Sequence, residues 1–432
     1  MQNQPSICIL FTKQFPFGHH ENYILHEIPY LFKYFDRVIV VPYDEFNYED
    51  HRLKANLDSR LEIFKINKIH PQLGVAGKIK REIIIRFLLI SEIFRSREWK
   101  LHLKNFKKLI GGLRHLYHSS IALTNFISKE QLTPQNSIFY HYWLHRGVMI
   151  SMMARRFHGA PEYINVSRGH TRDMYHKSWN AIVDRHDFFL PYEKTKWDFL
   201  DRVFPISEHA LRFVGSVLPQ HLHKASVSRL GVYSFEKPVY HPPLAIKQVV
   251  TCSFADDNKR NHLLPEILKH LPYKIKWTHF GSAVPGVREQ LEKLCAEHAD
   301  IIEFDFRGPT PNADILKFYR ENRVDLFFTL SKVESLPVSL MEAAAAGIPM
   351  VSTSVVATPE IVNESNGYLM PVDFDPKQVA DRISEIFVNE ELWKKKSQSA
   401  RLTFEERFDA DKNFNTFCNE LRNILEQNKI KS

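Results

Sequence analysis

The sequence predicts an α/β protein built from two doubly wound domains. At 432 residues the chain is too long for one hydrophobic core, and two domains of about 200 residues are expected. Short β-branched runs alternate with amphipathic helical segments in both halves, as in parallel sheets covered by helices. Three prolines cluster between the halves and stiffen the chain there. We therefore expect a domain at 1–235, a linker at 236–247 and a domain at 248–432.

The first half begins with the run Ser6–Leu10, a helical pattern over Glu21–Phe35 and a second run at Val38–Val41. Strand, helix and strand form the first unit of a doubly wound sheet. A helical and basic insert at 76–129 then interrupts the alternation. Further strands are expected at Ser137–Tyr140, Tyr163–Val166, Arg202–Ile206 and Lys224–Leu230.

The second half repeats the same pattern. Its expected strands are Gln248–Phe254, Lys274–Phe280, Ile301–Phe306, Leu326–Thr329 and Pro349–Ser352, and its first helices are Leu263–His270 and Val287–His298. Ligands of open α/β sheets bind beyond the carboxyl ends of the strands. Two such domains in one chain predict a ligand-binding cleft between them.

Composition and cysteine usage favour a soluble, cytoplasmic protein. The four cysteines (Cys8, Cys252, Cys295 and Cys418) are scattered and include no CxxC pair, which fits a reducing compartment. The apolar run Ile7–Phe11 is too short for a signal peptide, and no stretch reaches the length of a membrane span.

The net charge of +8 is unevenly distributed along the chain. Residues 1–235 hold 33 basic and 21 acidic residues, against 25 and 29 in the remainder. Eleven basic residues fall between Lys78 and Arg114, around the apolar run Ile83–Ile90. This composition is typical of a helix that lies on an anionic membrane surface, so we expect peripheral association with the inner membrane face. The alternative is a solvated insert whose apolar face packs on the first domain. No nucleic-acid-binding module is recognisable.

The most informative stretch is Thr329–Glu360. The strand Leu326–Thr329 runs into a loop, and a helix is expected over Pro337–Ala346, ended by Gly347. The N-terminus of a helix favours a phosphate or diphosphate. Two carboxylates, Glu334 and Glu342, could accept hydrogen bonds from sugar and ribose hydroxyls.

This stretch resembles the signature of family 4 of the retaining glycosyltransferases, roughly S-x-x-E-G-x-P-x-x-x-x-E-A-x-A-x-G-x-P-V. The residues that match in place are Ser331, Glu334, Pro337, Glu342, Ala343, Ala345, Gly347 and Pro349. The resemblance implies two Rossmann-like domains of the GT-B type, with a terminal helix that crosses back to the first domain. It also implies retaining transfer of a sugar from a nucleotide-sugar to a hydroxyl, without a metal or other cofactor.

The same resemblance implies roles for individual residues. Glu334 would contact the donor sugar and Glu342 the ribose, with Ser335, Leu336 and Pro337 lining the donor site. Ser335 stands where the family has glycine, and Val355–Ala357 replaces a turn that carries two glycines.

Other loops of the second half complete the implied donor site. In the resembled family the loop after the first strand often carries an arginine and, six residues later, a lysine that hold the diphosphate. Lys259 occupies the lysine position, Ser253 replaces the arginine, and Arg260 is a candidate to compensate. Gly281, Gly308 and Pro309 resemble the loops that line the nucleoside pocket.

The first half resembles a bacterial branch of the family that acts on cell-surface polysaccharides. Gly18 lies where the family has a glycine-rich loop facing the diphosphate. His170 matches a histidine that points at the donor sugar, and Arg168 and Asp173 complete an R-x-H-x-x-D pattern. The acidic residues Glu21 and Glu27 also match this branch. The resemblance therefore implies Glu334, His170 and Lys259 as catalytic residues and a lipid-linked or saccharide acceptor.

The sequence also allows a metal site in the first half and two other functions for the whole chain. His141 and His145 have the i, i+4 spacing of a metal pair on one helical face, but no third ligand has suitable spacing, so we expect no metal site. A nucleotide-sugar epimerase of the same fold and a catalytically inactive nucleotide-sugar-binding protein are the alternatives to a transferase.

Overall fold

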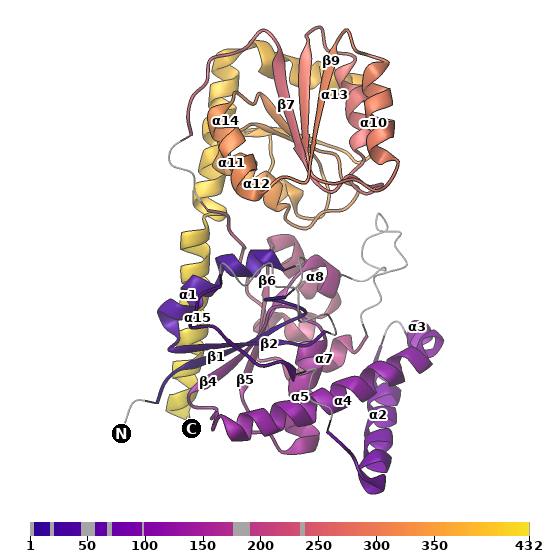
Figure 1. Cartoon of the computed structure of the whole chain (residues 1–432), viewed down its shortest axis with the longest axis vertical. Helices are drawn as coiled ribbons and strands as arrows, with labels where there is room; N and C mark the ends of the chain where they lie inside the picture. Colours follow the sequence, from indigo (N-terminus) through magenta and orange to yellow (C-terminus); the bar gives the residue numbers. More distant parts are fainter. Residues whose placement is uncertain are drawn as a thin grey trace. The chain divides into compact units, whose positions relative to one another are not determined.

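The computed structural model describes residues 4–17, 21–44, 57–66, 71–96, 99–175, 191–233 and 238–431. Contacts divide the chain into two compact units (Figure 1). Unit 1 comprises Met1–Ile206, Ala210–Ser228 and Phe414–Ser432, and unit 2 comprises Ser207–His209 and Arg229–Asn413. Each unit contains one parallel sheet.

The sheet of unit 1 has the strand order β3-β2-β1-β4-β5-β6, and every neighbouring pair is parallel. Its strands are β1 (Ile7–Thr12), β2 (Arg37–Pro42), β3 (Glu62–Ile63), β4 (Ser137–His141), β5 (Ile164–Gly169) and β6 (Arg202–Pro205). All residues of β1 and β4 are buried, as expected for central strands covered on both faces. The strand order reverses between β1 and β4, so the switch point lies there.

The sheet of unit 2 has the order β12-β11-β10-β7-β8-β9 and is also parallel throughout. Its strands are β7 (Lys247–Cys252), β8 (Ile275–Phe280), β9 (Ile302–Gly308), β10 (Leu326–Thr329), β11 (Met350–Thr353) and β12 (Gly367–Met370). Counted within each unit, both sheets follow the order 3-2-1-4-5-6 of dinucleotide-binding folds. The prediction of two doubly wound domains is thus confirmed, and the switch point of unit 2 lies between β7 and β10.

Helices cover these sheets. In the first half they are η1 (Asn22–His26), α1 (Ile28–Tyr34), α5 (Arg146–His158), α6 (Thr171–Met174), α7 (Glu193–Phe199), α8 (Glu208–Val217) and η4 (Pro219–Lys224). In the second half they are η5 (Asn261–Leu263), α9 (Leu264–Leu268), α10 (Val287–Ala296), α11 (Asn312–Glu321), α12 (Val338–Ala345), η6 (Thr358–Glu360), α13 (Pro376–Val388), α14 (Glu390–Arg407) and α15 (Ala410–Lys431). Helix α15 begins in unit 2, and its residues from Phe414 onward belong to unit 1.

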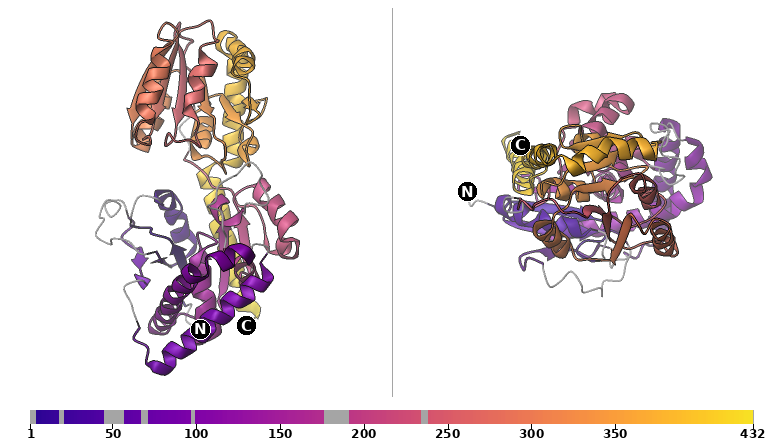
Figure 2. Two further views of the ribbon diagram at one scale, coloured as in Figure 1. Left: turned by 90° about the vertical axis from the view of Figure 1, so that its right-hand side faces the viewer. Right: turned by 90° about the horizontal axis from the view of Figure 1, so that it is seen from above.

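The predicted insert of unit 1 is helical. It contains α2 (Val75–Arg95), α3 (Trp99–Lys104) and α4 (Phe106–Lys129). Helices α2 and α3, violet in Figures 1 and 2, lie on the side of unit 1 away from α1 and α15, whereas α4 runs back toward the C-terminal end of α15. One face of α2 buries Ile85, Leu88 and Leu89, so the insert is packed on its own unit.

Several element boundaries differ from the expectations. The strand expected at Lys224–Leu230 is absent: η4 ends at Lys224, and only Ala225 forms an isolated bridge, to Val203. The helix expected over Glu21–Phe35 is divided into η1 and α1, with Pro29 at the start of α1. Strands β3 and β12 were not anticipated, and β3, with two residues, is too short to show a periodic pattern.

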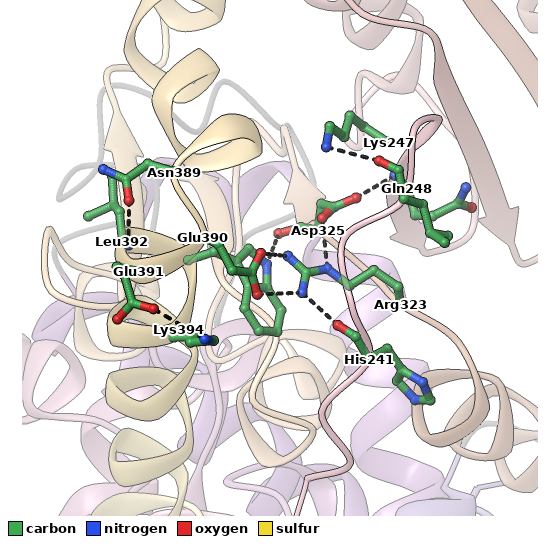
Figure 3. A network of polar contacts seen from close by, with 12 residues as sticks. His241, Lys247, Gln248, Arg323, Asp325, Asn389, Glu390, Glu391, Leu392 and Lys394 are labelled. Carbon is green, nitrogen blue, oxygen red and sulfur yellow. Dashed lines mark hydrogen bonds and ion pairs between the residues drawn. The ribbon is translucent and has the colours of Figure 1, made fainter.

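A buried arginine attaches the proline-rich segment to unit 2 (Figure 3). Arg323 donates to the carbonyl oxygen of His241 at 2.8 Å and to Asp325 at 2.8 Å. Its two terminal nitrogens also bond both carboxylate oxygens of Glu390, at 3.1 and 3.0 Å, and its guanidinium lies 3.6 Å from the ring centroid of Trp393. Because a bidentate pair of this kind fixes direction as well as distance, the chain at His241 is held against β10 and α14.

Candidate functional site

Two loops of unit 2 meet beyond the carboxyl ends of β7 and β10, the strands that flank its switch point. The side chain of Asn258 accepts a hydrogen bond from the N–H of Val333 at 3.2 Å and donates one to its carbonyl oxygen at 3.1 Å. The carbonyl oxygen of Asn258 accepts from the N–H of Lys332 at 2.8 Å. These three bonds hold the loops in register, so that Lys259 stands opposite Glu334.

Lys259 and Glu334 form an ion pair, in which Nζ of Lys259 donates to Oε1 of Glu334. The hydroxyl of Ser331 donates to the same oxygen at 2.9 Å. The two charged side chains are 25% and 15% exposed, so the pair can be reached from solvent. It therefore offers a cation for a phosphate group beside an acceptor for a hydroxyl group.

Arg260, the next residue, is buried and adopts the left-handed conformation with φ of 52°. Its Nε donates to the carbonyl oxygen of Leu330 at 2.6 Å and its Nη1 to that of Val372 at 2.9 Å. These bonds tie the end of β10 to the segment after β12. Among the described residues only Nη2 is left without a partner, so most of the guanidinium serves the fold, and its contact with a donor stays a prediction.

Glu342 lies in the middle of α12 and is almost fully buried, with 7% of its surface exposed. The amide of Asn312 donates to its Oε1 at 2.7 Å. Burial raises the pKa of Glu342 to about 7, and the hydrogen bond from Asn312 acts in the opposite direction. The carboxyl group is therefore close to half ionised at neutral pH, and hydroxyl donors from a ligand would favour the ionised form.

Three further loops of unit 2 lie side by side because their backbones contact directly. A Cβ on Gly281 would lie 1.9 Å from the carbonyl oxygen of Ser253, and Gly281 has φ of 126°, so only glycine fits there. The N–H of Gly281 donates to the carbonyl oxygen of Gly308 at 2.8 Å. The predicted nucleoside-pocket residues Gly281, Gly308 and Pro309 thus border the loop that carries Lys259.

The start of α12 follows the loop of Glu334 directly. Pro337 is the N-cap of the helix, with extended backbone, where the sequence predicted it inside the first turn. Leu336 and Pro337 are buried, and Ser335 is half-buried. The N-terminus of α12 and the Lys259–Glu334 pair are therefore separated by only three residues.

The turn at Val355–Ala357 is strained. Val356 has φ of 47°, a conformation in which a β-branched residue is a genuine outlier. The hydroxyl of Thr358 fastens the turn: it donates to the carbonyl oxygen of Thr353 at 2.6 Å and accepts from the N–H of Val355 at 3.0 Å. These bonds hold Val356 in the left-handed conformation, at an energetic cost of about 1–3 kcal/mol.

In unit 1, His170 follows β5 and is buried against aromatic rings. Its ring centroid lies 4.4 Å from that of Trp143, and its Nε2 lies 3.1 Å from the carbonyl oxygen of Tyr142. Burial, and then the charge of Arg168, lower the pKa of His170 to about 3. His170 is therefore neutral at physiological pH and acts as a polar, oriented ring.

Asp173 positions the backbone around His170. Its two carboxylate oxygens accept hydrogen bonds from the N–H groups of His170 and Leu144, each at 2.7 Å. Burial raises the pKa of Asp173 to about 6. The carboxylate thus joins the loop after β4 to the loop after β5.

Arg168, the first residue of the R-x-H-x-x-D pattern, has a structural environment. It is fully buried, bonds Glu27 at 3.2 Å and the hydroxyl of Tyr140 at 2.8 Å, and lies 3.8 Å from the ring centroid of Phe417 in α15. The hydroxyl of Tyr140 donates to the other oxygen of Glu27 at 2.9 Å. This buried pair fastens α15 to the sheet of unit 1.

Glu21 organises the loop after β1. Its carboxylate accepts from the backbone N–H groups of Lys13, Gln14 and Phe15 at 3.2, 2.5 and 2.7 Å and from the indole of Trp143 at 2.5 Å. The ammonium of Lys13 lies 4.2 Å from the ring centroid of Trp143. Gly18, predicted to belong to this loop, lies outside the described residues.

The interpretation that His141 and His145 lie on one face of a helix is wrong. His141 ends β4 and bonds Asn165 at 3.2 Å, whereas His145 is the N-cap of α5. Tyr142 and Trp143 lie in the connecting loop, not on a helix. The two histidines therefore do not share one helical face.

Sequence reasoning missed Asn258, Asn312, Lys13 and Lys196. Asn258 and Asn312 hold the loop of Lys259 and the carboxyl group of Glu342, and Lys13 lies over Trp143. Lys196 is a buried lysine whose Nζ donates to the carbonyl oxygen of Leu144 at 3.1 Å. No local pattern marks these residues, since their contacts join segments far apart in the chain.

Parts of the chain are similar in sequence to known glycosyltransferases. Residues 247–403 match the model of the glycosyl transferases group 1 family. An 89-residue stretch is 36% identical to N-acetyl-alpha-D-glucosaminyl L-malate synthase of Bacillus anthracis, covering 20% of this chain and 23% of that protein. WcaL of Escherichia coli, provisionally named for colanic acid biosynthesis, is 26% identical over 251 residues, 55% of this chain and 56% of its own. The chain thus spans about half or less of the length of these curated relatives.

Solved structures share the fold over nearly the whole chain. HepE of Anabaena in complex with UDP has a TM-score of 0.62 at 14% identity, covering 96% of this chain and 98% of that one. A glycosyltransferase from Rickettsia africae gives 0.67 at 13% identity (98% and 100%), and sucrose-phosphate synthase from Thermosynechococcus elongatus gives 0.66 at 13% (98% and 100%). The two six-stranded units therefore have the GT-B fold of these proteins.

Proposed function

We propose that the chain is a retaining glycosyltransferase that moves a sugar from a nucleoside-diphosphate sugar to a hydroxyl of a saccharide or lipid-linked acceptor in cell-surface polysaccharide synthesis. The observation that carries the proposal is the Lys259–Glu334 ion pair beyond the ends of β7 and β10. Ligands of doubly wound sheets bind at this switch point. The family match over residues 247–403 includes both residues, and HepE was solved with UDP, which supports a nucleotide donor.

The residues of unit 2 divide naturally among the parts of such a donor. In this proposal the ammonium of Lys259 binds the diphosphate, and Glu334 binds hydroxyls of the transferred sugar. Buried Glu342, beside Asn312, would accept hydrogen bonds from the ribose. A donor that binds there replaces part of the Lys259–Glu334 contact with a lysine–phosphate contact, so Glu334 becomes available to the sugar.

The proposed chemical step retains the anomeric configuration. The bond from the anomeric carbon to the diphosphate oxygen breaks while a bond to the acceptor oxygen forms on the same face. The acceptor proton passes to the departing diphosphate oxygen. Lys259 stabilises the negative charge that develops there, so the step is proposed to need no metal ion.

His170 is proposed to orient the sugar. Since its pKa lies far below neutral, it enters the reaction uncharged and can form a hydrogen bond without carrying a proton to the leaving group. Asp173 and Trp143 fix the position of its ring.

One experiment separates the proposal from its two alternatives. Purified protein is screened by thermal shift against UDP-, GDP- and ADP-sugars, and the stabilising donor is incubated with candidate acceptors in buffer containing EDTA. A new glycoside whose anomeric configuration by NMR equals that of the donor supports a retaining transferase. An epimerised donor would identify an epimerase. Donor binding without any turnover would identify an inactive nucleotide-sugar-binding protein. A product of opposite anomeric configuration would identify an inverting transferase.

The exposed face of the insert supports a membrane-surface location. Six apolar side chains of α2 are 47–86% exposed: Val75, Ile79, Ile83, Phe87, Ile90 and Phe94. At 100° per residue they fall within about a third of the helix circumference, opposite the buried face. Exposed Lys80 borders this stripe and exposed Arg86 lies within it, whereas Glu82 is neutralised by Arg81 and Arg114. Within the described residues no helix is long and apolar enough to span a membrane.

An exposed apolar stripe with basic residues beside and within it is complementary to an anionic bilayer, in which the apolar residues enter the interface and the basic residues meet lipid phosphates. We therefore commit to an anionic lipid surface as the occupant of this face. The stripe is called the α2 stripe below.

A further inference from the structure

A polar pocket is lined entirely by residues of unit 1, and His170 is not among them. It measures about 260 Å³ and is formed by the first turns of α4, the N-terminus of α5, the two residues before α7 and Lys196 within α7. These three helices lie together in Figure 1. The pocket residues used below are Lys108, Leu109, His145, Arg146, Tyr192 and Lys196.

The pocket has a positive electrostatic character. Lys108, Arg146 and Lys196 line it, and none of its lining residues, all of them in described parts of the chain, is acidic. Carboxylates outside the lining offset part of this charge: Asp44 bonds Arg146 at 3.2 Å, and Asp173, Glu193 and Glu92 attract Lys196.

The field of these cations is visible at His145. Burial first, and then the charges of Lys196, Lys13 and Arg146, hold the pKa of His145 well below its usual range. His145 is the N-cap of α5 and makes no side-chain capping bond to that helix. The positive end of the α5 dipole therefore adds to the charges of Lys108, Arg146 and Lys196, which line the pocket.

Polar groups inside the pocket are left for a ligand. The hydroxyl of Tyr192, which is 5% exposed, has no hydrogen-bond partner among the described residues, and neither has Nδ1 of His145. Lys196 is 2% exposed and donates to a single carbonyl oxygen, that of Leu144. A buried donor without a partner costs about 1–3 kcal/mol, and a group that accepts several hydrogen bonds would remove this cost.

The remaining wall is apolar, formed by Leu109, Leu113, Leu116 and Met149. An anion without an organic part would leave this wall uncovered. A phosphate ester of an apolar chain would match both walls at once.

We propose that this pocket binds a phosphate or diphosphate group through Lys108, Arg146, Lys196 and Tyr192. If the proposed transfer is correct, the group belongs to the acceptor, which then carries its phosphate on an apolar chain. The identification as acceptor rests on the proposed function, whereas the binding itself does not.

The test is direct binding by isothermal titration calorimetry with three probes: geranyl diphosphate, inorganic diphosphate and geraniol. The double variant K108Q/R146Q removes two exposed charges and should fold, and Tyr192→Phe removes a single hydroxyl. R156Q is the matched control, because Arg156 is exposed near the other end of α5. UDP is first titrated into each variant. In a second series the three probes are titrated in the presence of saturating UDP, so that any diphosphate bound in unit 2 is displaced.

We expect the double variant to bind geranyl diphosphate at least about tenfold more weakly, and Tyr192→Phe about threefold more weakly, with R156Q unchanged. Tighter binding of geranyl diphosphate than of inorganic diphosphate assigns the phosphate to a lipid, and equal binding assigns it to a free anion. Unchanged affinity in both pocket variants, or binding of geraniol as tight as that of its diphosphate, overturns the proposal. If the wild type does not bind UDP, the proposed function is refuted, whereas the binding of geranyl diphosphate in unit 1 is unaffected.

Discussion

Lys259 and Glu334 are paired although 75 residues separate them in the chain. The pairing depends on Asn258, whose side chain and backbone hold the segment of Lys332 and Val333. A cation that already has a carboxylate partner is fixed in place before a donor arrives. Such preorganisation is most valuable where charge develops in the reaction.

Lys259→Ala should therefore reduce kcat by about ten- to a hundredfold while raising the donor KM much less, since a charge-assisted hydrogen bond contributes about 1.5–3 kcal/mol and is strongest in the transition state. Steady-state kinetics with the donor found in the screen measures both constants. Lys332→Ala, which removes an exposed lysine from the opposing loop, is the control and should behave as wild type. A large rise in KM at unchanged kcat would contradict the assignment.

Glu334→Gln and Glu342→Gln should separate turnover from binding. The first removes the charge beside Lys259 and should lower kcat, and the second weakens the hydrogen bonds to the ribose and should raise the Kd for UDP by about tenfold. Kinetics and UDP titration distinguish them. Wild-type values in both variants would refute the roles given to this loop and helix.

Donor affinity should depend on pH through Glu342. Because its pKa is raised to about 7, the carboxyl group is mostly protonated at pH 6 and mostly ionised at pH 8. Only the ionised form accepts hydrogen bonds at both oxygens, so UDP should bind more tightly as pH rises through 7 and then level off. Titrations at pH 6, 7 and 8 test this, and Glu342→Gln should flatten the difference.

The same shift affects stability with the opposite sign. Between its ordinary value of 4.5 and about 7, Glu342 binds more protons in the folded than in the unfolded state. The free energy of unfolding attributable to this group therefore decreases as pH rises across that window. Urea unfolding of wild type and Glu342→Gln at pH 5 and pH 8 would show it, and an unchanged difference between the two proteins would argue against the raised pKa.

Val356→Gly should stabilise unit 2. Removing the strain of the left-handed valine should raise the free energy of unfolding by about 1–3 kcal/mol. The greater freedom of glycine in the unfolded chain should lower it by about 0.5–1 kcal/mol. Ala357→Gly is the matched control, because Ala357 has φ of −109° and glycine there should only destabilise. Denaturant unfolding measures both, and a loss of stability in Val356→Gly would mean that the side chain contributes more through packing than the backbone costs.

The α2 stripe should bind anionic vesicles in a salt-sensitive way. F87S/F94S should abolish sedimentation with phosphatidylglycerol vesicles, and K78Q/K80Q/R86Q should weaken it, since each basic residue near such a surface contributes about 1 kcal/mol. V388S/L402S is the control, because it removes two exposed apolar side chains from unit 2. If the wild type does not bind vesicles but forms dimers, and F87S/F94S is monomeric, the stripe would instead be an interface with a second copy of the chain.

Sequence patterns were sufficient for the two doubly wound domains, the helical insert and the motif that contains Glu334 and Glu342. These features depend on local periodicity and on short motifs, which are present in any stretch of the chain taken alone. The same logic failed for the strand expected at Lys224–Leu230, which has a single β-branched residue and meets the edge strand β6 only through the Ala225–Val203 bridge and two backbone hydrogen bonds.

Tertiary structure alone decided how individual polar groups are used. Arg260 and Arg168 look equally available in the sequence, yet two backbone carbonyls engage Arg260, and Glu27, Tyr140 and Phe417 enclose Arg168. The pKa values of Glu342 and His170 follow from burial, which depends on segments far away in the chain. Residue type and spacing determine which chemistry is available, whereas desolvation and partner geometry, which arise only when distant segments pack, determine which groups can perform it.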